Sequence, residues 1–194
     1  MGFPTVFIRL TGCPLRCQYC DTAYAFSGGM NQSLDAILDR VKTYPARYVT
    51  VTGGEPLAQP GCIPLLTMLC DAGYQVSLET SGAMDISNVD SRVMTVLDIK
   101  TPDSNEVDRN LWENLSHLRS TDHIKFVICS RADYEWSRDV LRSQALHERC
   151  EVLFSPSYAQ LTARQLAEWI VEDGLPVRFQ IQLHKMLWGE EQGR

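Results

Sequence analysis

The sequence has neither a run of basic residues nor a long apolar stretch. It carries 18 lysines and arginines against 24 aspartates and glutamates, which gives a formal net charge of −6 at pH 7. Without a basic stripe to follow a phosphate backbone, direct binding to nucleic acid is not expected. No apolar run approaches the roughly 20 residues that cross a membrane, and residues 1–5 contain no basic region ahead of an apolar stretch. We therefore expect a cytoplasmic protein that binds neither nucleic acid nor membrane.

Low-complexity tracts, internal repeats and interdomain linkers are also missing from the sequence. Hydrophobic residues make up 44% and charged residues 22% of the chain, proportions that exclude disordered, collagen-like and solenoid proteins. A chain of 194 residues can bury one sizeable core. We therefore expect a single domain over residues 1–194.

The sequence has few histidines, and its seven cysteines are unevenly spread. Cys13, Cys17 and Cys20 lie within eight residues of one another. An odd number of cysteines, clustered in this way in a reducing compartment, favours metal ligands over a disulfide framework. We interpret the remaining cysteines as small core residues; they are Cys62, Cys70, Cys129 and Cys150.

The hydrophobic pattern alternates between helix-like and strand-like segments. Helical spacing covers residues 33–44, 63–72, 133–147 and 162–172, with a shorter helix near 111–118. Strand-like segments cover residues 4–10, 47–52, 74–79, 93–99, 124–129, 151–154 and 177–183. This alternation predicts βαβ units around a parallel sheet. Since a complete eight-fold barrel takes ~250 residues, we expect an α/β fold with a partial, shortened parallel β/α barrel. A doubly wound open sheet is the alternative.

Informative residues follow the predicted strands at their carboxyl ends, where parallel folds place their chemistry. The segments are 11–13, 52–56, 79–82, 98–100 and 155–157. The first opens a loop in which three thiols can wrap one face of a metal centre. A structural zinc site needs four Cys or His ligands, yet no fourth cysteine is near and the first histidine is His117. A 4Fe-4S cluster held by three thiolates would instead leave one iron open to a substrate or cofactor.

This Cys-x3-Cys-x2-Cys loop, with an aromatic residue before its last cysteine and Gly53-Gly54-Glu55-Pro56 further on, resembles the radical S-adenosylmethionine enzymes. The resemblance implies that Cys13, Cys17 and Cys20 hold a 4Fe-4S cluster whose open iron binds S-adenosylmethionine. One electron then cleaves the sulfonium, and the resulting 5′-deoxyadenosyl radical abstracts a substrate hydrogen.

Within that superfamily, the sequence resembles the 7-carboxy-7-deazaguanine synthases of queuosine and deazapurine biosynthesis. The matching segments are 2–22, 51–56, 78–82, 98–100, 155–157 and 184–185. This resemblance implies a lyase that converts 6-carboxy-5,6,7,8-tetrahydropterin to 7-carboxy-7-deazaguanine with loss of ammonia. It also implies magnesium, a flavodoxin- or ferredoxin-type electron donor and a homodimer.

The same resemblance assigns roles to individual residues. Glycine at positions 53 and 54 would let the backbone approach a ligand and adopt strained dihedrals, and Glu55 would accept from the ligand ammonium. Alone, these residues would be an ordinary strand-to-helix turn. The implied S-adenosylmethionine site comprises Tyr19, Asp21, Gly53, Gly54, Glu55, Thr80, Ser81, Asp98, Ile99, Lys100, Ser155, Pro156, Ser157 and Tyr158.

Arg9 shares a predicted strand face with Phe7, so its guanidinium points where a barrel interior would be. A substrate carboxylate would be a suitable planar partner, in agreement with the family's substrate-binding arginine. Otherwise Arg9 reaches solvent at the strand end. Further substrate-binding positions of the family match Thr52, His184 and Lys185. For His184 and Lys185, a solvated pair near the terminus is an equally good interpretation.

Thr22 matches the family's magnesium ligand. A neutral hydroxyl is a weak ligand, but it suits a hard cation that keeps waters and takes other oxygens from the substrate. Without the resemblance, Thr22 would be a turn residue whose hydroxyl bonds to the backbone.

The sequence departs from the family at its start, because only twelve residues precede Cys13. Relatives carry about two dozen more residues there, so we expect a core domain that lacks an N-terminal segment and turns over substrate weakly. Two other functions stay open from the sequence. One is an activase that installs a glycyl radical on a partner protein, and the other is a non-enzymatic zinc-binding module.

Replacing Cys17 by alanine should abolish both the cluster and the activity, because its thiolate is a direct ligand. Iron and acid-labile sulfide, measured after anaerobic reconstitution, test this. A stoichiometric zinc ion without sulfide in the unmodified protein would contradict the iron-sulfur assignment.

Overall fold

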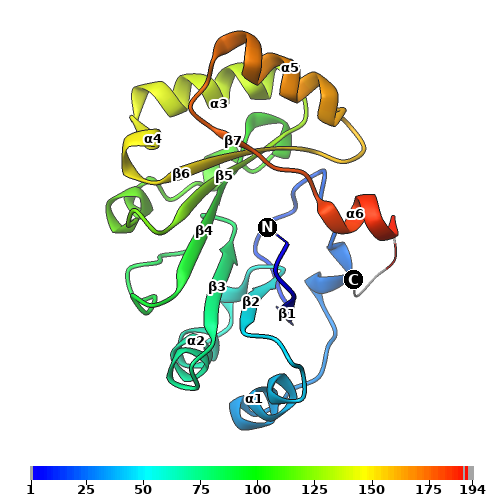
Figure 1. The fold of residues 1–194 in the computed structure, drawn as a ribbon, viewed down its shortest axis with the longest axis vertical. Coiled ribbons are helices and arrows are strands. Elements are labelled where there is room, and N and C mark those ends of the chain that lie inside the picture. Colours follow the sequence, from blue (N-terminus) through cyan, green and yellow to red (C-terminus); the bar gives the residue numbers. More distant parts are fainter. Residues whose placement is uncertain (1, 190, 192–194) are drawn as a thin grey trace.

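The computed structural model describes residues 2–189 and 191 and contains one seven-stranded parallel sheet. The strands follow one another in chain order across the sheet. Their bounds are β1 Thr5–Leu10, β2 Tyr48–Gly53, β3 Gln75–Thr80, β4 Met94–Ile99, β5 His123–Ile128, β6 Glu151–Pro156 and β7 Arg178–Phe179. β1 pairs only with β2 and β7 only with β6 in the described part of the chain, so the barrel is open (Figure 1).

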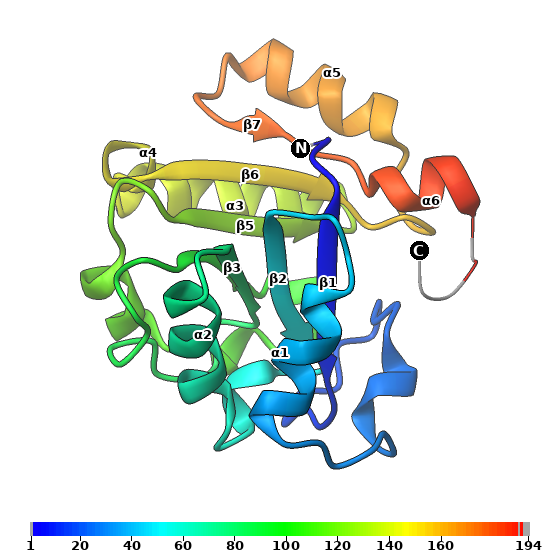
Figure 2. The same ribbon diagram turned by 60° about the horizontal axis from the view of Figure 1, so that its bottom comes forward.

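The helices that connect the strands lie along the convex side of the curved sheet, whereas the helix after the last strand lies at its open side (Figures 1 and 2). The α-helices are α1 Leu34–Lys42, α2 Cys62–Asp71, α3 Arg131–Ser143, α4 Leu146–Arg149, α5 Ala163–Asp173 and α6 Leu183–Trp188. Short 3₁₀ helices cover Ala23–Phe26, Pro56–Ala58, Pro102–Ser104, Val107–Arg109 and Trp112–His117. Within the described residues, no helix is long and apolar enough to cross a membrane.

The strands alternate between an apolar outer face and a polar inner face. Val49 and Val51 are fully buried under α2, whereas Thr50 between them hydrogen-bonds Ser77 of β3 at 2.8 Å on the inner face. A second apolar cluster, centred on Phe126 and Phe154, packs β4 to β7 against α3 and α5. The helix-covered face therefore holds the core, and polar side chains line the inner face.

This architecture confirms the partial parallel β/α barrel. A doubly wound sheet reverses its strand order at a switch point and carries helices on both faces. Here the order is sequential, and both apolar clusters lie on the helix side. The doubly wound alternative is therefore wrong.

Two predicted elements differ from the observed ones. The helix expected over 133–147 is broken because Ala145 has φ 47°, which separates α3 from α4. The strand expected over 177–183 ends at Phe179, and α6 begins at Leu183. His184 and Lys185 therefore lie in a helix rather than directly after a strand, and the side chain of His184 lies outside the described residues.

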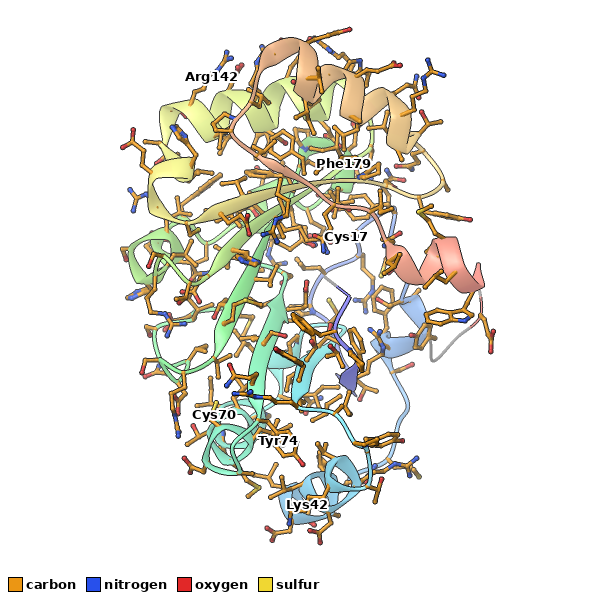
Figure 3. All side chains as sticks on the ribbon, viewed as in Figure 1. Cys17, Lys42, Cys70, Tyr74, Arg142 and Phe179 are labelled. Atoms are coloured by element: carbon orange, nitrogen blue, oxygen red, sulfur yellow. The ribbon has the colours of Figure 1, made fainter. Side chains whose placement is uncertain are left out.

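Three of the four scattered cysteines are buried as predicted. Cys62 and Cys150 belong to the two apolar clusters, and Cys129 is buried at the end of β5. Cys70 is only partly buried at the margin of the cluster under α2. Figure 3 shows Cys70 beside Tyr74 at that edge of the molecule.

Asp133 joins the loops that follow β4 and β5. Its fully buried carboxylate accepts hydrogen bonds from the Thr101 hydroxyl at 3.0 Å, the Asp103 amide at 2.9 Å and the Cys129 amide at 3.0 Å. Without Asp133 the Cys129 amide would be a buried donor without this partner, whereas the Thr101 hydroxyl would keep its contact with the Val127 carbonyl at 3.1 Å. This carboxylate fixes the rim of the sheet near Lys100.

Replacing Asp133 by alanine should lower the free energy of unfolding by roughly 1–3 kcal/mol for each buried donor left without a partner. Asp139→Ala on the same helix is the control, because Asp139 is exposed and pairs with Arg138 only at 3.4 Å. Anaerobic urea denaturation compares the two variants. Equal stabilities would contradict the role of Asp133.

Candidate active site

The carboxyl ends of the strands form one rim, and the cysteine loop after β1 is tied to it at several points. Glu55 donates its amide to the Gly12 carbonyl at 2.8 Å, which joins the loop to β2. Gln18 donates its amide to the Ser104 carbonyl at 3.1 Å, and the Arg16 amide donates to Glu106. The loop is therefore held over the ends of β2 and β4. Figure 3 places Cys17 near the middle of the molecule.

Gly53 and Gly54 bring the end of β2 against this loop. A Cβ on Gly54 would lie 2.4 Å from the Gly12 carbonyl oxygen and 2.8 Å from the Cys13 Cβ. A Cβ on Gly53 would lie 2.1 Å from the Leu10 carbonyl oxygen. Neither glycine has a positive φ. The expectation of strained dihedrals is therefore wrong, and the observed reason for glycine is close contact with the backbone of β1 and its loop.

The three loop cysteines are partly buried free thiols. Burial raises the pKa of the Cys17 thiol to about 11 and also raises the pKa of Cys13. A metal must therefore displace their protons to bind thiolates. Within the described residues, no three Cys, His, Asp or Glu side chains converge on a point where a single metal ion could sit.

Tyr19, Asp98 and Lys100 form a buried polar group beside the loop. The Lys100 ammonium donates to Asp98 Oδ2 at 2.9 Å and lies 5.9 Å from the centre of the Tyr19 ring. Burial alone would lower the pKa of Lys100, but Asp98, Tyr19 and Cys17 together keep it above its usual range. The Tyr19 hydroxyl and Asp98 Oδ1 are buried without a hydrogen-bond partner among the described residues. A polar ligand at this point would satisfy them.

The backbone of Lys100 is fixed by Asn110, a residue that sequence reasoning missed. Its amide side chain accepts from the Lys100 amide at 2.8 Å and donates to the Lys100 carbonyl at 2.8 Å. Ile99 packs in the outer core, so only its backbone faces the rim. No sequence signal distinguished Asn110 from other loop asparagines.

Glu55 forms hydrogen bonds within the protein. Its side chain is fully buried, and its carboxylate accepts from the Leu57 amide at 3.0 Å, the Thr80 hydroxyl at 2.9 Å and the Ser81 amide at 2.6 Å. Protein donors enclose this carboxylate, and its contact with a ligand ammonium stays a prediction. Glu55 joins the ends of β2 and β3, and the Thr80 hydroxyl donates its hydrogen bond to Glu55.

Other predicted residues lie around the same rim. Ser155, Pro156 and Ser157 are buried at the end of β6, whereas Tyr158 is exposed and its ring centre lies 5.5 Å from the Lys185 ammonium. Thr22 is partly buried, with its hydroxyl 3.7 Å from Cys20 Sγ. The structure thus brings the cysteine loop, the β6 end and α6 to one side of the sheet.

Arg9 and Thr52 are paired positions on β1 and β2 and share the inner face. The Arg9 guanidinium lies 5.7 Å from the centre of the Tyr24 ring. It has no ion pair with a carboxylate in the part of the chain that the structure describes. A ligand anion on the inner face could therefore bind it.

Lys125 and Glu79 form an inner-face pair, with 3.7 Å between the ammonium and a carboxylate oxygen. The neighbouring Glu79 raises the pKa of Lys125. Lys125 was missed by sequence reasoning. The alternation of residues from His123 to Ile128 nevertheless indicates its position, because it places a lysine on the polar face of a central strand.

Comparison with known proteins agrees with this geometry. The model of the radical SAM superfamily matches residues 7–98. The chain is 42% identical over 193 residues to 7-carboxy-7-deazaguanine synthase of Chlorobaculum tepidum, covering 98% of this chain and 88% of that protein. It is 40% identical over 205 residues to the protein of that name in Koribacter versatilis, covering 98% and 91%.

Solved structures show the same fold. The crystal structure of QueE from Escherichia coli matches with a TM-score of 0.75 at 22% identity, over 93% of this chain and 86% of that one. Streptococcus suis SuiB bound to S-adenosylmethionine matches with a TM-score of 0.63 at 15% identity, over 93% and 51%.

Replacing Gly54 by alanine should lower the free energy of unfolding by about 1–3 kcal/mol, because its methyl group would overlap the Gly12 carbonyl group and the Cys13 Cβ. It should also reduce iron-sulfur content after reconstitution by displacing the loop. Gly61→Ala is the control, since its Cβ would meet only Leu34 Cδ2 at 3.7 Å. If both variants bind equal amounts of iron, close packing of the loop against Gly54 is not required for cluster binding.

Proposed function

The chain belongs to the 7-carboxy-7-deazaguanine synthase family of radical S-adenosylmethionine enzymes, and we propose that it converts 6-carboxy-5,6,7,8-tetrahydropterin to 7-carboxy-7-deazaguanine with loss of ammonia. Family membership implies a 4Fe-4S cluster and S-adenosylmethionine. The relatives that cover nearly the whole chain carry the synthase name, so the activase and zinc-module alternatives are not favoured.

The observation that carries the proposal is the pair of buried polar atoms without partners beside a three-cysteine loop. The Tyr19 hydroxyl and Asp98 Oδ1 face no protein donor or acceptor among the described residues, whereas Lys100 is fixed next to them. These residues fit a polar, zwitterionic cofactor. Cys13, Cys17 and Cys20 would hold the cluster.

When bound, the cluster and S-adenosylmethionine supply the one-electron chemistry that removes a hydrogen atom from the substrate. The chain's own residues supply binding and orientation. Lys100 offers a fixed cation near the loop, and the seating of Gly54 under Cys13 fixes the end of β2. The buried segment from Ser155 to Ser157 excludes water from the same side.

We assign Arg9 and Thr52 to the substrate, with the guanidinium binding the pterin carboxylate. The exposed position of Arg9 on the inner face and its lack of an ion pair in the described chain support this. A charge-assisted, bidentate contact would fix the ring relative to the cluster. Lys185 of α6 lies close enough to Tyr158 to line the same opening, and His184 precedes it in that helix.

Magnesium is part of the proposal, with the Thr22 hydroxyl as one ligand and water and substrate oxygens as the others. Asp21 and Tyr19 on the same loop, together with Thr80, Ser81 and Tyr158, complete the proposed cofactor surroundings. We also propose a cytoplasmic homodimer that receives electrons from a reduced flavodoxin or ferredoxin.

Anaerobically reconstituted protein, given 6-carboxytetrahydropterin, S-adenosylmethionine, magnesium and reductant, should form 7-carboxy-7-deazaguanine, detected by mass spectrometry. Arg9→Gln should raise KM about 10- to 100-fold, because a charge-assisted contact of roughly 1.5–3 kcal/mol is lost. Arg47→Gln, at the exposed start of β2, is the control. Cleavage of S-adenosylmethionine by the unmodified protein without any deazapurine would reject the proposed substrate.

A further inference from the structure

Two amide oxygens near the end of the chain are buried without a partner. Gln180 Oε1 and Gln182 Oε1 are enclosed and accept no hydrogen bond from any described residue. They belong to the segment between β7 and α6, which crosses the open side of the sheet (Figure 1). Buried acceptors of this kind are uncommon, because they lose hydration and gain nothing in return.

The alternation of this segment places Gln180 on the inner face. Val177 and Phe179 pack against the outer core cluster, so the residue after Phe179 points to the opposite side. The Gln180 amide donates to the Phe154 carbonyl at 2.9 Å and so extends the ladder between β6 and β7 by one bond. Gln180 therefore continues the polar inner face past the last strand.

Gln182 is held against the cysteine loop. Its Nε2 donates to Asp21 Oδ2 at 2.9 Å, a contact across 161 positions of the sequence. An ionised carboxylate only accepts hydrogen bonds, so the amide nitrogen must face Asp21 and the amide oxygen must face away. The orientation of Gln182 is thus set by the protein, and its oxygen can only accept.

We propose that Gln180 and Gln182 accept hydrogen bonds from the N–H groups of the pterin and determine how its ring is held. This inference rests on the proposed function. A tetrahydropterin carries N–H donors on both rings and on its exocyclic amine, whereas its carboxylate would bind Arg9 on β1. Two buried acceptors on the opposite edge of the open sheet complement that arrangement, and the orientation of one of them, Gln182, is set by Asp21.

A metal ion is the less suitable occupant. Amide oxygens can bind hard cations, but two neutral amides and the Thr22 hydroxyl would bring no negative charge to a divalent ion. The nearby carboxylate is Asp21, and its Oδ2 already accepts a hydrogen bond from Gln182 Nε2. Neutral N–H donors can bind to these amide oxygens without any negative charge beside them.

The test replaces each glutamine by methionine, which has similar length and no amide oxygen. Gln180→Met and Gln182→Met should each raise KM for 6-carboxytetrahydropterin about tenfold. Iron content should not change in either variant. Affinity for S-adenosylmethionine should not change in Gln180→Met, which leaves the contact between Gln182 and Asp21 intact. Gln144→Met is the matched control, because Gln144 is exposed at the end of α3. Anaerobic equilibrium dialysis with the same pterin, without reductant, measures binding independently of turnover.

Thermal unfolding without substrate supplies a readout that a structural role would not produce. Since Gln180 Oε1 has no partner in the described chain, Gln180→Met should leave Tm unchanged or raise it while weakening pterin binding. Unchanged pterin affinity in both variants would overturn the inference, as would an altered magnesium requirement with normal pterin affinity. Product formation by the unmodified enzyme tests the proposed function separately.

Discussion

The close seating of the cysteine loop on the end of β2 is the constraint on which the site depends. Gly54 lies against Gly12 and Cys13 with no room for a side chain, and the Glu55 amide donates to the Gly12 carbonyl. The buried Glu55 carboxylate then extends this contact to β3 through Thr80 and Ser81. The thiols are thus positioned by backbone packing and one buried carboxylate, which are stiffer supports than a surface loop could provide.

A second constraint is the division of the sheet into two faces. The outer face buries valine, leucine and phenylalanine under the helices. The inner face carries charged and amide side chains, including Arg9, Lys125 and Gln180. Polar groups that are buried on this face are costly unless they pair with one another or with a ligand. The pairs among them stabilise the empty surface, and the remaining single groups mark where a polar molecule belongs.

Much of this organisation could be predicted from the sequence, because period-two and period-3.6 patterns are local. The strands lie within one or two residues of their predicted limits except at the end of the chain. There, Val177, Phe179, Ile181 and Leu183 alternate like a strand, yet the ladder stops after Gln180 and a helix begins at Leu183. Where strand pairing ends depends on the neighbouring strand, which a local pattern does not contain.

The candidate site was predicted only where a motif marked it. The cysteine loop and the glycine pair stood out by spacing, but the use of Glu55 as an internal acceptor depends on contacts with residues 25 and 26 positions away. Asn110 and Gln182 were missed for the same reason. Each acquires its role from a partner distant in the chain, and no local pattern records such a partner.

The contact between Gln182 and Asp21 also has a consequence for biosynthesis. The cysteine loop leaves the ribosome before the segment that contacts it, because Gln182 lies 161 positions after Asp21. Synthesis proceeds at ≈ 5–20 residues per second, so about 8–32 s pass between the synthesis of Asp21 and that of Gln182. During that interval Asp21 lacks its contact with Gln182, so the two edges of the open sheet can be joined only after the later segment has left the ribosome.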